Sequence, residues 1–219
     1  MTETEKTTRT EKATKTESRL LATRERLAEG SGPPVFEGSG VELVHVVEAT
    51  AIGSMLLVAR GDGRLVASLF VPTSGDVDAG LERLARQISP RILGVTRVAG
   101  GEGRRTVDAV RRQLEQYLTG RRHDFDVRLD LALTTPFQRQ VLTALPQVVG
   151  YGRRASYGEV AAGLGRPKAS RAVGTALGAN PLCVVLPCHR VVGATGALTG
   201  YAGGLAAKRY LLDLETRET

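Results

Sequence analysis

The chain contains few cysteines, histidines and aromatic residues, and the low counts of cysteine and histidine exclude several classes of protein. Two cysteines among 219 residues are too few for a disulfide scaffold, and three scattered histidines form no evident zinc site. No apolar run approaches the roughly 18 residues of a membrane-spanning helix, and the N-terminus lacks the apolar core of a secretory signal. We therefore expect a cytoplasmic protein of a reducing compartment, with no membrane partner and no bound metal.

Positive charge is concentrated in the last part of the chain. Residues 127–219 hold eleven lysines and arginines against five acidic residues, whereas residues 31–126 hold twelve of each and residues 1–30 hold seven against six. This asymmetry is expected where one part of a chain faces a polyanion, and nucleic acid is the leading candidate. A basic surface that serves only solubility is the alternative.

The first half of the chain predicts a tail followed by an α/β domain. Fourteen of the first eighteen residues are Thr, Glu or Lys without apolar periodicity, so residues 1–30 are predicted to be a disordered or weakly ordered tail. Residues 31–125 then alternate strand-like and helical patterns. Strands are expected at 41–47, 55–59, 65–71 and 92–98, with a tight hairpin at 61–63, and helices at 77–88 (with Ser74 and Asp76 as candidate caps) and from about 106 to Gly120.

The second half, residues 126–219, predicts a mainly helical domain. Thr135 and Pro136 form an N-cap followed by proline at the first helical position. Ser156 is a candidate cap for the next helix, and a Gly-Arg-Pro turn at 165–167 leads to a helix over about 169–177. This succession is the helix-turn-helix pattern, although any helical hairpin produces the same pattern.

One short segment carries a possible nucleophile. Cys188 is followed by His189 and Arg190, a setting that favours the thiolate, which is the nucleophilic form of cysteine. Without further context, a neighbouring Cys and His are more often structural than catalytic. Cys183 has apolar neighbours and is predicted to be a small core residue.

The segment Pro187-Cys188-His189-Arg190-Val191 resembles the active-site motif of the O6-alkylguanine-DNA alkyltransferases, also called methylated-DNA–protein-cysteine methyltransferases. The strong likeness runs from about residue 135 to 215, and a weaker one covers the α/β unit before it, where a small sheet with helices in a ribonuclease-H-like roll is expected. The other matching elements are Ser156-Tyr157-Gly158, Arg171-Ala172-Val173-Gly174, Asn180-Pro181, Gly200-Tyr201, Gly203-Gly204-Leu205, Lys208, Leu211, Leu212 and Glu215.

The resemblance implies DNA repair by direct, irreversible and stoichiometric transfer of an alkyl group from O6 of guanine to the protein's own cysteine, without a cofactor. Cys188 would be the acceptor, His189 the general base and Glu215 the anion that orients it. Adjacent residues on an extended strand point to opposite faces, so a bridging water between Cys188 and His189 is expected. Asn180 would hold the turn before this strand, and Tyr157 would assist the departing guanine. Activity on O4-alkylthymine is left open.

The same resemblance implies that a monomer flips the damaged nucleotide out of double-stranded DNA through the minor groove, because the target carbon lies inside a stacked duplex. Arg171 would fill the gap in the stack, on a helix whose small residues permit close approach. The expected DNA-binding residues are Arg171, Ala172, Gly174, Tyr157 and Ser156. The expected pocket residues are Tyr201, Val191, Ala202, Gly203 and Lys208.

Three other functions compete with this interpretation. A non-catalytic binder of alkylated DNA on the same fold is the first, but relatives of that kind replace the acceptor cysteine. A cysteine hydrolase using Cys188 and His189 would turn over and would need an oxyanion hole. A transcription regulator that senses alkylation carries additional metal-ligating cysteines, which this sequence lacks, as it lacks the zinc ligands of some relatives.

Overall fold

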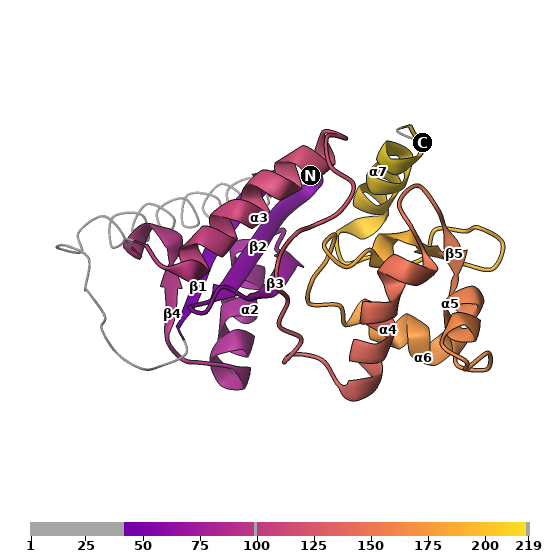
Figure 1. Cartoon of the computed structure of the whole chain (residues 1–219), viewed down its shortest axis with the longest axis horizontal. Coiled ribbons are helices and arrows are strands. Elements are labelled where there is room, and N and C mark those ends of the chain that lie inside the picture. The colour runs from indigo at the N-terminus through magenta and orange to yellow at the C-terminus, as the bar shows by residue number, and fades with distance from the viewer. Residues whose placement is uncertain (1–41, 99, 218–219) are drawn as a thin grey trace, which may run out of the picture. The chain divides into compact units, whose positions relative to one another are not determined.

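The computed structural model describes residues 42–98 and 100–217, so the expected tail at 1–30 lies outside the described residues. The first half contains a mixed sheet in the order β3-β2-β1-β4, in which β1 is antiparallel to β2 and parallel to β4 (Figure 1). The prediction of a small sheet with helices is confirmed. Its elements are β1 (Leu43–Thr50), β2 (Gly53–Arg60), β3 (Leu65–Phe70), α2 (Ser74–Gln87), β4 (Ile92–Gly94), the 3-10 helix η1 (Val95–Arg97) and α3 (Glu102–Leu118).

Two local expectations in this half were wrong. The strand expected over 92–98 ends at Gly94, since Arg104 takes the carbonyl oxygens of Val95 and Val98 as hydrogen-bond acceptors at 3.0 and 2.5 Å. The cap of α2 is Thr73 in place of Ser74, because Thr73 and Asp76 form a reciprocal capping box.

The two faces of the sheet are covered by different helices. Alternate residues of β2 point to opposite faces. Leu56 and Val58 pack in a cluster with Leu84 of α2, whereas Ala59 packs with Val107 of α3. At Gly103 the first turn of α3 approaches β2 so closely that a Cβ would lie 2.7 Å from the Arg60 carbonyl oxygen. The absence of a side chain at Gly103 thus permits the close contact between α3 and β2, and this contact fixes the position of the N-terminal end of α3.

The second half is mainly helical, as expected. The N-caps at Thr135 and Ser156 are confirmed as capping boxes, and the helix-turn-helix prediction corresponds to α5 and α6, which pack together. Among the described residues no helix is both long and apolar enough to cross a membrane. The elements are α4 (Pro136–Val148), β5 (Ala155–Ser156), α5 (Tyr157–Gly163), α6 (Ser170–Gly178), the 3-10 helix η2 (Cys188–Arg190), β6 (Val191–Val192) and α7 (Gly204–Arg217).

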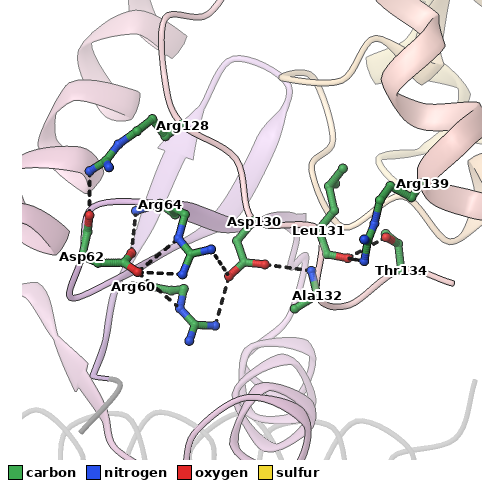
Figure 2. Close-up of polar contacts among 9 residues, drawn as sticks. All are labelled: Arg60, Asp62, Arg64, Arg128, Asp130, Leu131, Ala132, Thr134 and Arg139. Atoms are coloured by element: carbon green, nitrogen blue, oxygen red, sulfur yellow. Dashed lines mark hydrogen bonds and ion pairs between the residues drawn. The ribbon is translucent and has the colours of Figure 1, made fainter. Parts of the chain in front are cut away.

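The segment that joins the two halves is tied to the hairpin between β2 and β3. Its backbone pairs with Leu65 on the edge of β3: the Leu65 amide donates to the Arg128 carbonyl at 2.7 Å, and the Asp130 amide donates to the Leu65 carbonyl at 2.8 Å. Figure 2 shows the carboxylate of Asp130 between Arg60 and the Ala132 amide, which donate to it at 3.0 and 2.8 Å. The joining segment is therefore held in place by backbone hydrogen bonds to Leu65 and by the ion pair between Asp130 and Arg60.

The buried core does not stop at the expected domain boundary near residue 126. One cluster of buried side chains includes Leu57 and Val110 from the first half together with Val141 and Leu211 from the second. The division into domains at 31–125 and 126–219 stays a prediction. Because the cluster is shared, both halves can contribute side chains to one site.

Candidate active site

The segment that carries Cys188 is a turn and not the extended strand expected from the sequence. Cys188, His189 and Arg190 form the 3-10 helix η2, which the Arg190 amide closes by donating to the Pro187 carbonyl at 3.1 Å. Extended backbone begins only at Val191, where β6 pairs with β5. Cys188 and His189 still point in different directions in this turn, because successive side chains on a 3-10 helix are about 120° apart.

The loop before this turn, residues 180–187, is anchored to β3 by Ser68 of the first half. The Ser68 amide donates to the Pro181 carbonyl at 2.8 Å, and the Ser68 carbonyl accepts from the Cys183 amide at 3.0 Å. The Ser68 hydroxyl also donates to the Cys183 carbonyl at 2.8 Å. Val184 follows with a φ of 71°, a conformation that β-branched residues adopt only where the surroundings enforce it.

Within this loop, Asn180 and Cys183 both contact the sulfur of Cys188. The Asn180 amide nitrogen lies 3.1 Å from Cys188 Sγ and also donates to the Leu186 carbonyl at 3.1 Å. The pKa of Cys188 is lowered, chiefly by the hydrogen bond from the Cys183 thiol. The hydrogen bond from Asn180 and the positive charge of Lys208 lower it further, whereas burial opposes the shift. The interaction with Cys188 and burial raise the pKa of Cys183, the opposite direction to the shift at Cys188.

Behind Cys188 lies a buried group of four polar side chains. His189 Nε2 is 2.6 Å from Glu215 Oε1, and Arg190 Nε donates to Glu215 Oε2 at 2.8 Å. The Tyr117 hydroxyl, from the last turn of α3, donates to Glu215 Oε1. The solvent exposure of His189, Tyr117 and Glu215 is 1% or less, so these interactions take place out of contact with bulk water.

The charges within this group balance. Burial opposes ionisation of Glu215, but the hydrogen bond from His189 and the charge of Arg190 outweigh it and lower the pKa of Glu215 to about 2. Burial lowers the pKa of His189 more than Glu215 raises it, which favours a neutral imidazole. A neutral imidazole whose Nε2 proton is held by a carboxylate keeps Nδ1 as a proton acceptor. His189 Nδ1 is buried, and no described residue forms a hydrogen bond with it.

Cys188 opens into a cavity of about 380 Å³. Its lining residues are Tyr157, Gly174, Leu177, Gly178, Asn180, Cys183, Cys188, Gly200, Tyr201 and Ala202. A larger cavity of about 590 Å³ beside α3 has no thiol among its lining residues. The smaller cavity is therefore the one suited to nucleophilic chemistry.

The second half of the chain is similar to a known DNA-repair family. Residues 136–217 match the family described as "6-O-methylguanine DNA methyltransferase, DNA binding domain". The methylated-DNA–protein-cysteine methyltransferase of Mycolicibacterium paratuberculosis is 52% identical over 107 residues, which cover 49% of this chain and 64% of that protein. The inducible methyltransferase of Bacillus subtilis is 48% identical over 105 residues, covering 48% and 58%. The chain thus spans less than two thirds of the length of these curated relatives.

A solved structure extends the similarity over both halves. The crystal structure of Mycobacterium tuberculosis O6-methylguanine methyltransferase is 33% identical, with a TM-score of 0.64, and the match covers 82% of this chain and 95% of that one. The chain belongs to the O6-alkylguanine alkyltransferase family. The same M. tuberculosis protein solved in complex with DNA gives 34% identity and a TM-score of 0.62.

The residues expected to bind DNA in this alkyltransferase-family chain lie on and before α6. Arg171 and Ala172 are exposed on that helix. A Cβ at Gly174 would meet the Tyr157 ring at 3.6 Å, so the absence of a side chain there leaves the Tyr157 edge of the cavity open. Ser156 has a local structural role, because its hydroxyl caps α5 by accepting from the Glu159 amide at 3.1 Å.

Of the five residues expected at the pocket, two line the cavity. Tyr201 and Ala202 do so, whereas Val191, Gly203 and Lys208 are not among its lining residues. Lys208 is buried and donates to the Val191 and Thr199 carbonyls at 2.6 and 3.2 Å, so its ammonium group holds the backbone around the cavity. Gly203 packs against the ring of Phe70, which a Cβ would approach to 2.6 Å.

Sequence reasoning missed three residues that contact the reacting group or its neighbours. Tyr117 was not singled out among the apolar residues of its helix, Arg190 was considered only as a basic neighbour of Cys188, and Cys183 was interpreted as core alone. A buried tyrosine usually has a partner for its hydroxyl, and this was the one available signal. Within residues 42–98 and 100–217, no group of three or more His, Cys, Asp or Glu side chains could hold a metal ion.

Proposed function

We propose that this protein repairs DNA by transferring an alkyl group, such as methyl, from O6 of guanine to Cys188. The observation that carries the proposal is a sulfur with a lowered pKa at the wall of a cavity, backed by a buried imidazole and carboxylate. The alkyl carbon is a modest electrophile, so attack requires a thiolate. The named relatives are methyltransferases of this kind, which supports extending the activity to this chain.

In the proposed reaction the proton of Cys188 passes to Nδ1 of His189 through a bridging water, while the carboxylate of Glu215, held by Arg190, stabilises the imidazolium. The thiolate attacks the alkyl carbon, a carbon–sulfur bond forms, and the bond to O6 breaks with its electron pair left on guanine. Tyr157 lines the cavity and its hydroxyl is 2.7 Å from that of Thr199, so it can donate a hydrogen bond or proton to the departing base. The thioether product is stable to water, and each molecule acts once.

The proposed substrate is double-stranded DNA from which the damaged nucleotide is flipped into the cavity. Helices α5 and α6 supply the helix-turn-helix, and the exposed Arg171 on α6 is the candidate to fill the vacated position in the stack. A relative crystallised with DNA supports this part of the proposal. That the protein is monomeric and cytoplasmic stays a prediction, and activity on O4-alkylthymine stays open.

Incubation with duplex DNA containing O6-methylguanine should add one methyl group per protein, a gain of about 14 Da, at Cys188. Trypsin leaves both cysteines in one peptide, residues 172–190, so fragmentation of that peptide must assign the label. Cys188→Ala should bind the duplex but gain no mass. A label on Cys183, or more than one equivalent transferred, would contradict the assignment, and binding without any transfer would favour a non-catalytic binder of alkylated DNA.

Arg171→Ala should slow transfer from duplex DNA much more than transfer from the free base O6-benzylguanine, since only the duplex must be unstacked. Losing the stabilisation of one unstacked step, about 1 to 3 kcal/mol, corresponds to roughly tenfold or more in rate. Single-turnover rates on both substrates at saturating protein measure the difference. Lys168→Ala, a nearby exposed cation before α6, is the matched control. Equal slowing on both substrates would mean that Arg171 supports the fold or the cavity.

A further inference from the structure

Tyr117 joins the first half of the chain to the buried polar group. It lies in the last turn of α3 with no solvent exposure, and its ring packs against Phe125 and Tyr151 at centroid distances of 5.2 and 6.0 Å. Its hydroxyl contacts Glu215 Oε1 and lies 3.4 Å from both His189 Nε2 and an Arg190 nitrogen. A purely hydrophobic role would need no hydroxyl at this point.

We propose that Tyr117 is a positioning residue for the transfer reaction: its hydroxyl donates to Glu215 Oε1, the oxygen that also accepts the Nε2 proton of His189, and so limits the negative charge that this oxygen presents to the imidazole whose Nδ1 is the base. This inference rests on the proposed function for its kinetic consequence. The hydrogen-bond arrangement itself can be tested without any alkyl transfer.

The direction of each hydrogen bond is set by the groups that meet. An ionised carboxylate can only accept, so both Tyr117 and His189 Nε2 donate to Glu215 Oε1. Arginine can only donate, so the Tyr117 oxygen accepts from Arg190. Burial and the charge of Glu215 raise the pKa of Tyr117, which keeps the hydroxyl protonated. With Nε2 carrying the proton, Nδ1 of the neutral ring is the remaining acceptor.

Removal of the hydroxyl should make His189 more basic. Glu215 Oε1 would then share its negative charge with one donor in place of two, and a more concentrated charge stabilises the imidazolium. The pKa of His189 should rise, and the acid limb of the pH–rate profile should move to higher pH. The charged or titratable groups that face this imidazole come from several elements. They are Tyr117 of α3, Arg190 and the neighbouring Cys188 of η2, Lys208 and Glu215 of α7, and Tyr201 before α7.

The decisive measurement is an NMR titration of the histidine side-chain nitrogens in the full-length protein. The sequence has three histidines, His45, His123 and His189, so the signals of His189 can be assigned by their loss in His189→Gln. Wild type should show the Nε2-protonated tautomer, and Tyr117→Phe should titrate about half a pH unit or more higher, with the acid limb of O6-benzylguanine transfer displaced equally. Tyr210→Phe, which removes a half-exposed hydroxyl bonded to the Leu118 carbonyl, should change neither.

An Nδ1-protonated tautomer in wild type would overturn the proposal even if Tyr117→Phe fails to fold. An unshifted His189 titration in a folded Tyr117→Phe would also overturn it, as would a loss of rate by the same factor at every pH. If wild type transfers no alkyl group but its His189 shows the expected tautomer and shift, the proposed function fails while the positioning role stands.

Discussion

Glu215→Gln is expected to lower the free energy of unfolding by about 3 to 5 kcal/mol, because it leaves the buried guanidinium of Arg190 without its counter-charge. The glutamine side chain has nearly the same shape, so the loss is one of charge and hydrogen bonding. One carboxylate oxygen becomes an NH₂ group, which would face donors that the native oxygens accept from: Tyr117 and His189 on one side, or Arg190 on the other. Alkyl transfer should fall by about a hundredfold or more, on the order expected when a general base loses its orienting anion.

Urea unfolding of wild type and variant measures the change in stability. Asp213→Asn is the matched control on the same helix, because Asp213 is 51% exposed and lies 4.0 Å from an exposed Arg154, a pair expected to contribute less than about 1 kcal/mol. A loss below about 1 kcal/mol in Glu215→Gln would show that Arg190 does not depend on this carboxylate.

The pH dependence of the free energy of unfolding provides an independent check on the role of Glu215. The pKa of Glu215 is lowered from 4.5 to about 2 in the folded protein. The stability that a lowered carboxyl pKa contributes is fully present above the unfolded value and is lost as pH falls through the folded value. Wild type should therefore lose stability between about pH 4.5 and pH 2, and the Gln variant should lack this component.

Asp130→Asn is expected to lower the free energy of unfolding by about 2 to 3 kcal/mol, the second largest loss of stability that we predict. The Asp130 side chain is 8% exposed and its Arg60 partner 15%, so the charge pair is largely removed from water. Asparagine keeps an oxygen for the Ala132 amide, and the substitution isolates the charge. Because Asp130 fixes the segment between the two halves, protease cleavage near residue 130 should also become faster.

Asp62→Asn is the control in the same network, shown beside Asp130 in Figure 2. Its carboxylate is 51% exposed and pairs with an Arg64 that is 41% exposed, so its loss should cost less than about 1 kcal/mol. Equal losses in the two variants would mean that burial of Asp130 does not set its contribution.

Much of this architecture could be predicted from the sequence because it depends on local patterns. Short apolar runs separated by turn residues predicted the strands, and the caps at Thr135 and Ser156 marked where helices begin. The family resemblance singled out Glu215 as the anion that orients His189, and the structure buries Glu215 beside His189. Local patterns could not predict the 3-10 turn at Cys188, since residues flanked by valines resemble a strand until Pro187 and the following turn are seen together.

Contacts between segments that are far apart in the chain could not be predicted from the sequence. Tyr117 and Glu215 are 98 residues apart, and Ser68 and Cys183 are 115 apart, so no helical or strand period relates them. Cys183 was correctly expected to be buried, but its contact with Cys188 depends on the reversal of the chain at Val184. The missed residues are those whose position is set by packing between the two halves.

The anchoring of the Cys188 loop by Ser68 also bears on the colloidal behaviour of the protein. β3 is an edge strand, and an exposed edge offers unpaired backbone groups to a second chain. Here that edge is occupied at two points, by Leu129 opposite Leu65 and by Leu182 opposite Ser68. The loop that leads to the reactive sulfur thus also covers part of the edge through which β3 could pair with a second chain. Any modification of Cys188 bulky enough to displace the loop would uncover the strand and favour aggregation.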